Sequence, residues 1–383
     1  MIYLDHPATS WPKPPVVVEA MKDFLETTGA NPGRSGHRLS IAAGRVVHEA
    51  REGLANFFGA TKTDRVIFTN NATQALNMVI HTTLKPGDTV LTTSVEHNSV
   101  MRPLRTAEAR GVRVLVAPCD PSGQIDLDAF RQLLSHDVRL VVMTHASNVI
   151  GRIMPVSDIF QMAHCAGAMT LLDAAQTAGV VPIRAADLYA DFIAFTGHKS
   201  LQGPPGTGGL VICTDRAESE ISTFMQGGTG SRSQSETHPE VLPDRLEAGT
   251  PNGVGIAGLG AAIRWICSPE CDSLHQHQTR LIKYLIDGLI SIPGVEVFGP
   301  VEASDRVPLV SFRIKGKYVS EVGQRLDDDY GILCRVGLHC APAAHKIIGT
   351  FPEGVVRFGV GPFTSEEDVT RAIDAVSEIA ADG

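Results

Sequence analysis

Seven short runs of apolar, mostly β-branched residues recur between residues 64 and 213 of the chain. They occupy residues 66–69, 89–93, 112–117, 140–144, 169–172, 192–195 and 209–213. Most of the intervals between them hold 12 to 22 residues, which is enough chain for a helix. Strands that alternate with helices predict βαβ units and a mostly parallel sheet covered by helices on both faces. Ligands of such sheets bind at the carboxyl ends of the strands, so the residues that follow each run are the first candidates for a functional site.

The rest of the chain predicts a second, smaller domain. The 383 residues are roughly two to three times the length of a typical single domain of about 150 residues. A stretch rich in Gly, Ser and Pro, residues 227–243, interrupts the alternation and is interpreted as a long surface loop. We therefore predict an α/β fold with a large domain of residues 15–261, containing a seven-stranded sheet, and a smaller α+β domain of residues 1–14 and 262–383.

Charge and hydropathy exclude several classes of partner. The chain carries 33 Lys and Arg against 42 Asp and Glu, a net charge of −9, so it has no basic footprint for nucleic acid or an anionic membrane. It contains no run of 18 apolar residues, and its first ten residues lack the basic and apolar segments of a signal peptide. We expect a cytoplasmic protein whose partner is a small molecule or another protein.

Seven cysteines are scattered along the chain, at positions 119, 165, 213, 267, 271, 334 and 340. An odd number without regular spacing argues against a disulfide framework, so at least one thiol is expected to be free for chemistry. Cys267 and Cys271 form a close pair, but no second pair with metal-ligand spacing accompanies them. We therefore expect no metal site.

Polar residues follow several of the apolar runs, and Asp173 is the most informative of them. It comes directly after the apolar residues 169–172, where a carboxylate is largely desolvated and needs a cation or several hydrogen-bond donors. Lys199 lies 26 residues later, just past the next run, and could be that cation. From these residues alone, a simple ion pair and a ligand site between the two side chains are equally open.

A glycine-rich stretch at residues 203–210 is similar to the start of a phosphate-binding loop of nucleotidases. That motif requires a lysine followed by a serine or threonine, whereas Gly209 and Leu210 stand at those two positions here. A nucleotide-binding α/β protein of that kind is therefore excluded. The glycines are better interpreted as a tight turn beside Lys199.

Seven motifs then occur in a fixed order along the chain: Asn71-Ala-Thr-Gln74, Glu96-His-Asn98, Ser147-Asn-Val-Ile-Gly151, Asp173-Ala-Ala-Gln176, Thr196-Gly-His-Lys-Ser200, Glu247-Ala-Gly-Thr-Pro-Asn252 and Arg335-Val-Gly-Leu-His-Cys-Ala341. In this order the chain resembles the class V aminotransferases, which use pyridoxal 5′-phosphate (PLP), and within them the cysteine desulfurases. The similarity runs from Tyr3 to the region of Arg357. It implies the type I fold of PLP-dependent transferases, with a seven-stranded, mostly parallel sheet in the large domain.

The resemblance assigns a role to each motif. Lys199 would form the Schiff base with PLP and later move the α-proton, and Asp173 would face the pyridine nitrogen. His97 would stack on the ring as a further catalytic residue, and Gln176 would bind the ring hydroxyl. The residues implied around the phosphate are Ala72, Thr73, Thr196, His198 and, from the neighbouring subunit of a homodimer, Thr250. Those implied around the substrate are Asn148, which also contributes to the cofactor site, and Arg357, Arg335 and His37. His37 is equally well interpreted as an ordinary surface or core histidine.

Cys340 would decide the chemistry of such a site. It follows His339 in a turn-rich segment, with Arg335 nearby, and positive neighbours favour the reactive thiolate form of a cysteine. The resemblance implies that Cys340 accepts sulfur from L-cysteine as a persulfide, that L-alanine is released, and that the sulfur passes to an acceptor protein, for example in iron–sulfur cluster assembly. Cys334, at a strand end, is interpreted as structural.

A departure from the family pattern leaves other functions open. The segment Leu4-Asp-His-Pro-Ala8 replaces the more usual Leu-Asp-Asn-Ala-Ala, near the substrate entrance of the family. The alternatives are a selenocysteine lyase, another PLP-dependent C–S lyase or aminotransferase of class V, and a non-catalytic assembly subunit with the same fold. An intact set of Lys199, Asp173 and Arg357 argues against the non-catalytic subunit.

Overall fold

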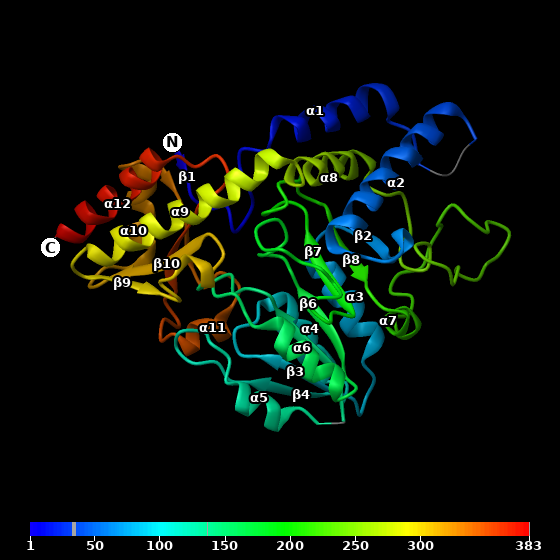
Figure 1. Cartoon of the computed structure of the whole chain (residues 1–383), viewed down its shortest axis with the longest axis horizontal. Helices are drawn as coiled ribbons and strands as arrows, with labels where there is room; N and C mark the ends of the chain where they lie inside the picture. Colours follow the sequence, from blue (N-terminus) through cyan, green and yellow to red (C-terminus); the bar gives the residue numbers. More distant parts are fainter. Residues whose placement is uncertain (33–35, 136, 383) are drawn as a thin grey trace.

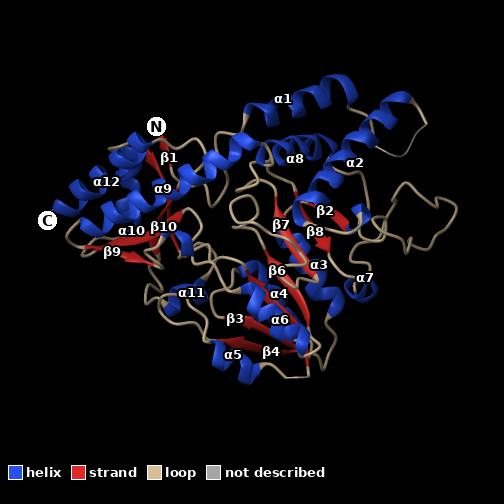
Figure 2. Cartoon of the chain, in the orientation of Figure 1, coloured by secondary structure: helices blue, strands red, loops and turns tan. Residues whose placement is uncertain are grey.

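A seven-stranded sheet forms the centre of the larger part of the molecule (Figures 1 and 2). The computed structural model describes residues 1–32, 36–135 and 137–382. In spatial order the strands are β2 (Val66–Thr69), β8 (Gly208–Ile212), β7 (Phe192–Thr196), β6 (Met169–Asp173), β5 (Val138–Thr144), β3 (Thr89–Thr93) and β4 (Arg113–Ala117). The pairs β7–β6, β6–β5, β5–β3 and β3–β4 are parallel, and β8 runs antiparallel to both of its neighbours. The predicted mostly parallel α/β sheet is therefore confirmed.

Side chains at alternate positions of the central strands pack into two separate hydrophobic cores. On β7, Phe192 and Ala194 pack into one core, while Ile193 and Phe195 pack into the other. The first core is closed by α3 (Ala72–Thr83), α4 (Asn98–Glu108) and α7 (Asp215–Glu220). The second is closed by α2 (Arg38–Phe58), α5 (Leu127–Leu133), α6 (Val156–Cys165) and α8 (Gly253–Ile266). Because successive side chains of a strand point to opposite faces, strands that are apolar at every position require this double cover.

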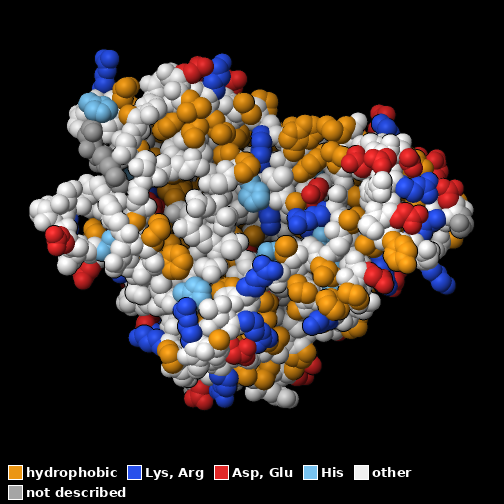
Figure 3. All heavy atoms as spheres, turned by 180° about the vertical axis from the view of Figure 1, so that it is seen from behind, with side chains coloured by type: hydrophobic (Ala, Val, Ile, Leu, Met, Phe, Trp, Pro, Cys, Tyr) orange, Lys and Arg blue, Asp and Glu red, His pale blue; other side chains and the backbone are white. Residues whose placement is uncertain are grey.

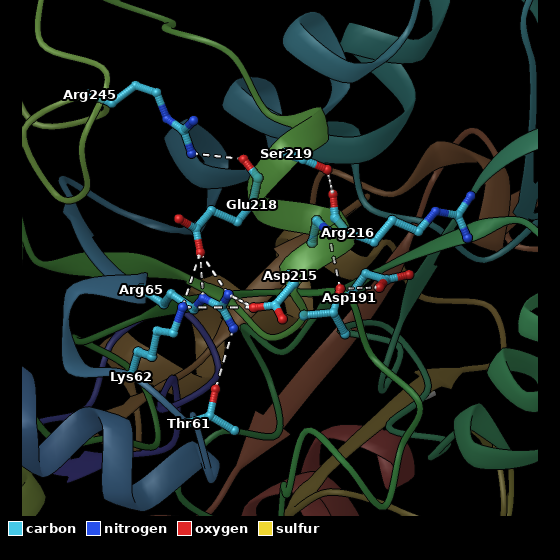
Figure 4. Close-up of polar contacts among 11 residues, drawn as sticks. Thr61, Lys62, Arg65, Asp191, Asp215, Arg216, Glu218, Ser219 and Arg245 are labelled. Carbon is cyan, nitrogen blue, oxygen red and sulfur yellow. Dashed lines mark hydrogen bonds and ion pairs between the residues drawn. The ribbon is translucent and has the colours of Figure 1, made fainter.

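One edge of the large sheet is fastened by a buried arginine. Arg65 ends a short 3-10 turn (Thr63–Arg65) just before β2 and is 3% exposed. Its guanidinium pairs with Asp215 and Glu218 of α7, and Lys62 and Thr61 lie around the same group (Figure 4). This cluster ties the start of β2 to the helix that follows β8. It gives the antiparallel edge a polar anchor in addition to its hydrophobic contacts.

A second sheet organises the smaller part of the chain. It is antiparallel, in the order β12 (Arg335–Gly337), β13 (Val355–Gly359), β10 (Leu309–Ile314) and β9 (Val295–Phe298). The helices α9 (Pro269–Ser291), α10 (Val319–Asp328) and α12 (Glu366–Ala381) pack with it around a core of their own. The short α11 (Pro342–Ile347) follows β12.

The two ends of the chain meet in this smaller part. Strand β1 (Ile2–Tyr3) pairs in parallel with β11 (Ile332–Leu333), and both termini lie on the same side of the molecule, at the left of Figure 1. This pairing supports the division into residues 15–261 and residues 1–14 with 262–383, which stays a prediction. Helix α1 (Pro15–Asp23) lies along α8 at the edge of the larger part, and it continues into a π-helical turn (Phe24–Thr28).

Residues 227–243, predicted to be a surface loop, contain no helix or strand and are largely exposed. Within the described residues, no helix has both the length and the hydropathy needed to cross a bilayer.

Candidate active site

A cavity of about 160 Å³ lies where β5, β6 and β7 end. The sheet places Thr144, Asp173 and Thr196 there as the last residues of these three strands. The lining includes nine of the residues singled out from the sequence: Ala72, Thr73, His97, Asn148, Asp173, Gln176, Thr196, His198 and Lys199. Segments that lie far apart in the sequence therefore converge on one small space, as expected for the carboxyl edge of a parallel sheet.

Asp173 and Lys199 face this cavity without forming an ion pair with each other. Asp173 is 4% exposed, and its Oδ1 accepts a hydrogen bond of 2.9 Å from the backbone of Ala175. Burial raises the pKa of Asp173, while the Ala175 amide and the Lys199 charge act in the opposite direction. A simple salt bridge does not satisfy the carboxylate, which leaves it available to a cationic group of a ligand.

Lys199 is placed to act as a nucleophile. Burial lowers the pKa of Lys199 to about 8; Asp173 opposes this shift, and the charges of Arg357 and Arg335 add to it. At neutral pH a useful fraction of the amine is then unprotonated, which an attack on a carbonyl carbon requires.

His97 presents a neutral ring to the same cavity. It caps α4, where its Nδ1 accepts a hydrogen bond of 3.0 Å from the backbone of Ser99 and lies 2.7 Å from the Ser99 hydroxyl. Burial lowers the pKa of His97 to about 4, with further lowering by Lys199 and by nearby arginines. A neutral ring held at one nitrogen is suited to stacking on a flat ligand.

Hydrogen-bond donors that could bind an anion lie at another wall of the cavity. Ala72 and Thr73 lie in the first turn of α3, where backbone N–H groups have no partner within the helix. Thr196 is 3% exposed, and its Oγ1 has no hydrogen-bond partner within the part of the chain that the structure describes. A buried hydroxyl without a partner is costly, so this atom indicates a ligand that supplies one.

The turn that carries Cys340 is docked against this cavity. His339 and Cys340 both adopt positive φ angles, +46° and +58°, which is unusual for residues other than glycine. The carbonyl of His339 accepts a hydrogen bond of 2.7 Å from the side chain of Asn148, and the carbonyl of Cys340 accepts one of 2.8 Å from the backbone of Asn98. Cys340 itself is exposed. The backbone of this turn is therefore strained, and its hydrogen bonds hold an accessible thiol near Asn148 and the start of α4.

Arg357 lies on β13, directly opposite Arg335 on β12, and is 1% exposed. Its Nη1 donates to the carbonyl of Asn148 (2.9 Å) and its Nη2 to Oδ1 of Asp5 (3.0 Å). Its Nε has no partner among the described residues. Burial lowers the pKa of Arg357 to about 10, and Asp5 opposes this shift.

Five residues suggested from the sequence do not line this cavity: Arg335, Arg357, Cys340, His37 and Thr250. Arg357 and the turn of Cys340 are hydrogen-bonded to Asn148 of the lining, whereas His37 and Thr250 lie elsewhere. His37 caps α2, where its Nδ1 accepts a hydrogen bond of 3.2 Å from the backbone of Ser40, and it is exposed. Thr250 lines a second, larger cavity of about 590 Å³, which it shares with Asn70 and Gln74. Neither side chain lines the smaller cavity of its own chain.

Sequence reasoning missed two polar residues that hold side chains of this site in place. Ser99 lines the cavity and fixes His97, and its position two residues after a capping histidine was the available signal. Asp5 reaches Arg357 from the opposite end of the chain, a contact without a local sequence signal. No group of three or more potential metal ligands occurs within the described ranges.

Comparison with known proteins agrees with this geometry. Residues 2–372 match the family model of the class-V aminotransferases. The chain is 34% identical to a probable cysteine desulfurase of Methanothermobacter thermautotrophicus, over 100% of this chain and 95% of that protein.

Solved structures are similar over almost the whole length. The apo structure of the cysteine desulfurase from Thermococcus onnurineus NA1 superposes with a TM-score of 0.91 at 33% identity, covering 99% of this chain and 94% of that one. The cysteine desulfurase CsdA from Escherichia coli, in an S-sulfonic acid form, gives a TM-score of 0.87 at 29% identity, covering 98% and 94%. The chain therefore belongs to the class-V aminotransferase family and, within it, to the cysteine desulfurases.

Proposed function

We propose that this protein is a PLP-dependent cysteine desulfurase that converts L-cysteine to L-alanine and holds the released sulfur as a persulfide on Cys340. One observation carries the proposal. A buried carboxylate and an amine face the same cavity without pairing, and the turn of an exposed cysteine is hydrogen-bonded to that cavity's Asn148.

The cavity residues fit pyridoxal phosphate. Asp173 would hold a proton on the ring nitrogen, His97 would cover the ring face, and the unpartnered hydroxyl of Thr196 would join the α3 N-terminus and His198 around the phosphate. Gln176 would bind the ring hydroxyl with the amide hydrogen that it does not donate to the carbonyl of Pro7. When bound, the cofactor supplies an electron-withdrawing ring that takes up the electrons of a bond broken at the substrate's α-carbon.

The chain's own groups then perform the proton and sulfur transfers. Arg357 and Asn148 would hold the substrate carboxylate, and the Lys199 amine, once freed from the cofactor, would move the α-proton. The thiolate of Cys340 would attack the substrate sulfur, forming an S–S bond as the C–S bond breaks. The carbon fragment keeps the electron pair of that bond, takes up a proton and leaves as L-alanine.

Cys340 is better placed for this step than its neighbour Cys334. Cys340 is exposed, whereas Cys334 is half-buried, and burial together with the Asp5 charge raises the pKa of Cys334 to about 12. An exposed sulfur carrier also suits transfer to an acceptor protein. Six of the cysteines, Cys119, Cys165, Cys213, Cys267, Cys334 and Cys340, are free thiols, which suits a reducing compartment such as the cytoplasm.

We further propose a homodimer in which Thr250 contacts the phosphate of the partner's cofactor. Thr250 lies outside the small cavity of its own chain, on the wall of the larger one. Hydrophobic side chains gather in places on the face shown in Figure 3. Val16 and Val18 of α1 and Leu25 of the turn that follows it are exposed. An apolar surface of this kind is typical of an interface between subunits.

The function is tested with three purified proteins: wild type, Cys340→Ala and Cys165→Ala. Cys165 is an exposed cysteine at the end of α6 and provides the matched control. We expect all three to carry the absorbance of bound PLP. We expect wild type and Cys165→Ala to form alanine from L-cysteine, and Cys340→Ala to lose this activity.

Three other results would contradict the proposal. Equal alanine yields in wild type and Cys340→Ala would indicate a C–S lyase. Activity confined to selenocysteine would indicate a selenocysteine lyase. A wild-type protein that binds no PLP would indicate a non-catalytic subunit.

A further inference from the structure

Two arginines lie opposite each other on neighbouring strands, and one of them, Arg357, is paired with a carboxylate. Arg335 and Arg357 are paired residues of β12 and β13, an arrangement of like charges that is unfavourable without a counter-ion. The only ion pair of Arg357 among the described residues is with Asp5, on the segment that follows β1. Arg335, Arg357 and Asp5 together carry a net positive charge, which favours the binding of an additional anion.

The Asp5–Arg357 contact is a single hydrogen bond. Nη2 of Arg357 lies 3.0 Å from Oδ1 of Asp5, and the buried Nε of the same guanidinium has no partner in the described chain. The pair of Arg51 and Glu247 shows the alternative within this molecule, because two guanidinium nitrogens there meet two carboxylate oxygens at 2.7 and 2.9 Å. A carboxylate that also reached Nε would bind Arg357 with two contacts and could replace Asp5.

Asp5 is free to leave this contact. Its side chain is 23% exposed, whereas that of Arg357 is 1% exposed. Its second carboxylate oxygen makes no hydrogen bond to any residue that the structure describes. Rotation of one partly exposed side chain would release Asp5 to solvent without any movement of β13.

We propose that Asp5 is an internal substitute for the substrate carboxylate: it neutralises Arg357 in the free enzyme, and the carboxylate of the incoming amino acid displaces it. The proposal rests on the proposed function, in which Arg357 holds the substrate carboxylate. The substrate carboxylate must therefore displace Asp5 from Arg357 before it forms its own ion pair with that guanidinium. Asp5 weakens amino-acid binding and keeps a buried guanidinium from standing unpaired between turnovers.

Competition and positioning predict opposite effects when Asp5 loses its charge. If Asp5 competes with the ligand, Asp5→Asn tightens binding of a carboxylate ligand. If Asp5 only orients Arg357, the same variant weakens binding. A ligand without a carboxylate separates an effect at Arg357 from a general disturbance of the site.

The test uses the PLP-loaded enzyme and follows the absorbance of its cofactor during titration with L-alanine and, in parallel, with L-alaninamide. We expect Asp5→Asn to bind L-alanine roughly three- to fivefold more tightly than wild type, the upper part of the range that a partly exposed ion pair contributes. We expect its affinity for L-alaninamide to change by less than about twofold. Asp329→Asn is the matched control, because it removes a charge paired with Arg325 on the same part of the chain, and it should change neither affinity.

Further variants keep the outcome decisive. Asp5→Ser removes the charge and leaves room for water, so it serves if Asp5→Asn does not fold, and it should tighten L-alanine binding in the same way. Asp5→Glu keeps the charge and should remain close to wild type. Unchanged or weaker L-alanine binding in both neutral variants would overturn the proposal.

The two proposals fail differently. If wild type and the Asp5 variants bind L-alanine and L-alaninamide as expected, but wild type releases no sulfur from L-cysteine, the proposed function alone is overturned. A wild type that carries PLP but binds no L-alanine would overturn the assignment of Arg357, and the role of Asp5 with it.

Discussion

The side-chain amide of Asn148 donates a hydrogen bond of 2.7 Å to the backbone carbonyl of His339, the residue before Cys340. The backbone carbonyl of Asn148 accepts a hydrogen bond of 2.9 Å from Arg357. Asn148 lines the cavity at the end of β5, so one residue joins the large sheet both to the cysteine turn and to the arginine of the smaller sheet. The positions of the thiol and of the guanidinium thus depend on the same short loop.

Asn148→Ala is expected to impair sulfur transfer more than proton transfer. The variant loses the bond to His339, so the strained turn is no longer held, and a small displacement of a reacting group costs up to about a hundredfold in rate. We expect persulfide formation on Cys340 to slow by about ten- to a hundredfold, measured by mass spectrometry after mixing with L-cysteine. Exchange of the α-proton of L-alanine with deuterated water needs Lys199 and not Cys340, so it should change much less when it is measured at saturating L-alanine, where weaker binding of the carboxylate does not affect the rate. An equal loss of both would place the role of Asn148 at the cofactor instead.

Covalent capture of PLP by the cofactor-free protein is expected to depend on pH through Lys199. Its amine attacks only when neutral, and burial lowers its pKa to about 8. Between pH 7 and pH 9 the neutral fraction, and hence the rate, should rise about tenfold and then level off. A rise of about a hundredfold that continues beyond pH 9 would indicate an ordinary lysine. Arg335→Met removes a charge that lowers this pKa and should move the profile to higher pH.

The sheet could be predicted from the sequence because its signal is local. Each apolar run marks a strand, and intervals long enough for a helix indicate parallel neighbours. The exception is β8, which runs antiparallel to β7. The connection between them, residues 197–207, contains no helix, and a short link without a crossover returns the chain in the opposite direction. The sequence did contain a signal, because the interval between the runs 192–195 and 209–213 is the shortest of the intervals between successive runs.

Without the family resemblance, which supplied Cys340, Arg335 and Arg357, the site could be predicted only where its residues follow strands of the large sheet. Asp173 and Lys199 were found this way, because the carboxyl ends of such strands share one edge. The contact of Asp5 with Arg357 spans 352 positions and joins a terminal segment to an antiparallel strand, where no such rule applies. The docking of Cys340 against Asn98 likewise depends on how the two parts of the chain pack together.

Thr196→Val is expected to act in opposite directions on the free and the loaded protein. The Thr196 hydroxyl is buried without a partner in the described chain, so replacing it with a methyl group should raise the stability of the cofactor-free protein by about 1 kcal/mol. The same change removes a donor for the phosphate and should weaken PLP binding by roughly tenfold or more. Thermal unfolding with and without PLP measures both effects.

Thr170→Val provides the matched control on the neighbouring strand β6. The Thr170 hydroxyl donates to the carbonyl of Tyr189 (2.8 Å) and accepts from the backbone of Asp191 (2.9 Å). Its removal should therefore destabilise the protein with or without PLP. A Thr196→Val protein that is destabilised in the same way would show that the Thr196 hydroxyl has a structural role.

His145 is expected to contribute to unfolding by acid. Its ring is 4% exposed and lies 3.0 Å from the Thr177 hydroxyl, and burial lowers its pKa from 6.5 to about 4. Between these two values the unfolded chain binds a proton that the folded protein does not. Folding stability is therefore lost as the pH falls through this window, by up to about 1.4 kcal/mol per pH unit for this one group.

His145→Gln keeps a hydrogen-bonding side chain and removes the titration. Denaturant unfolding of the cofactor-free protein at several pH values should show a slope, between pH 6.5 and pH 4, that is smaller than that of wild type by about one proton. His48→Gln, at an exposed position on α2, is the control for the substitution itself. If the slope of His145→Gln equals that of wild type, the acid sensitivity arises from the other buried histidines, among them His6 and His345.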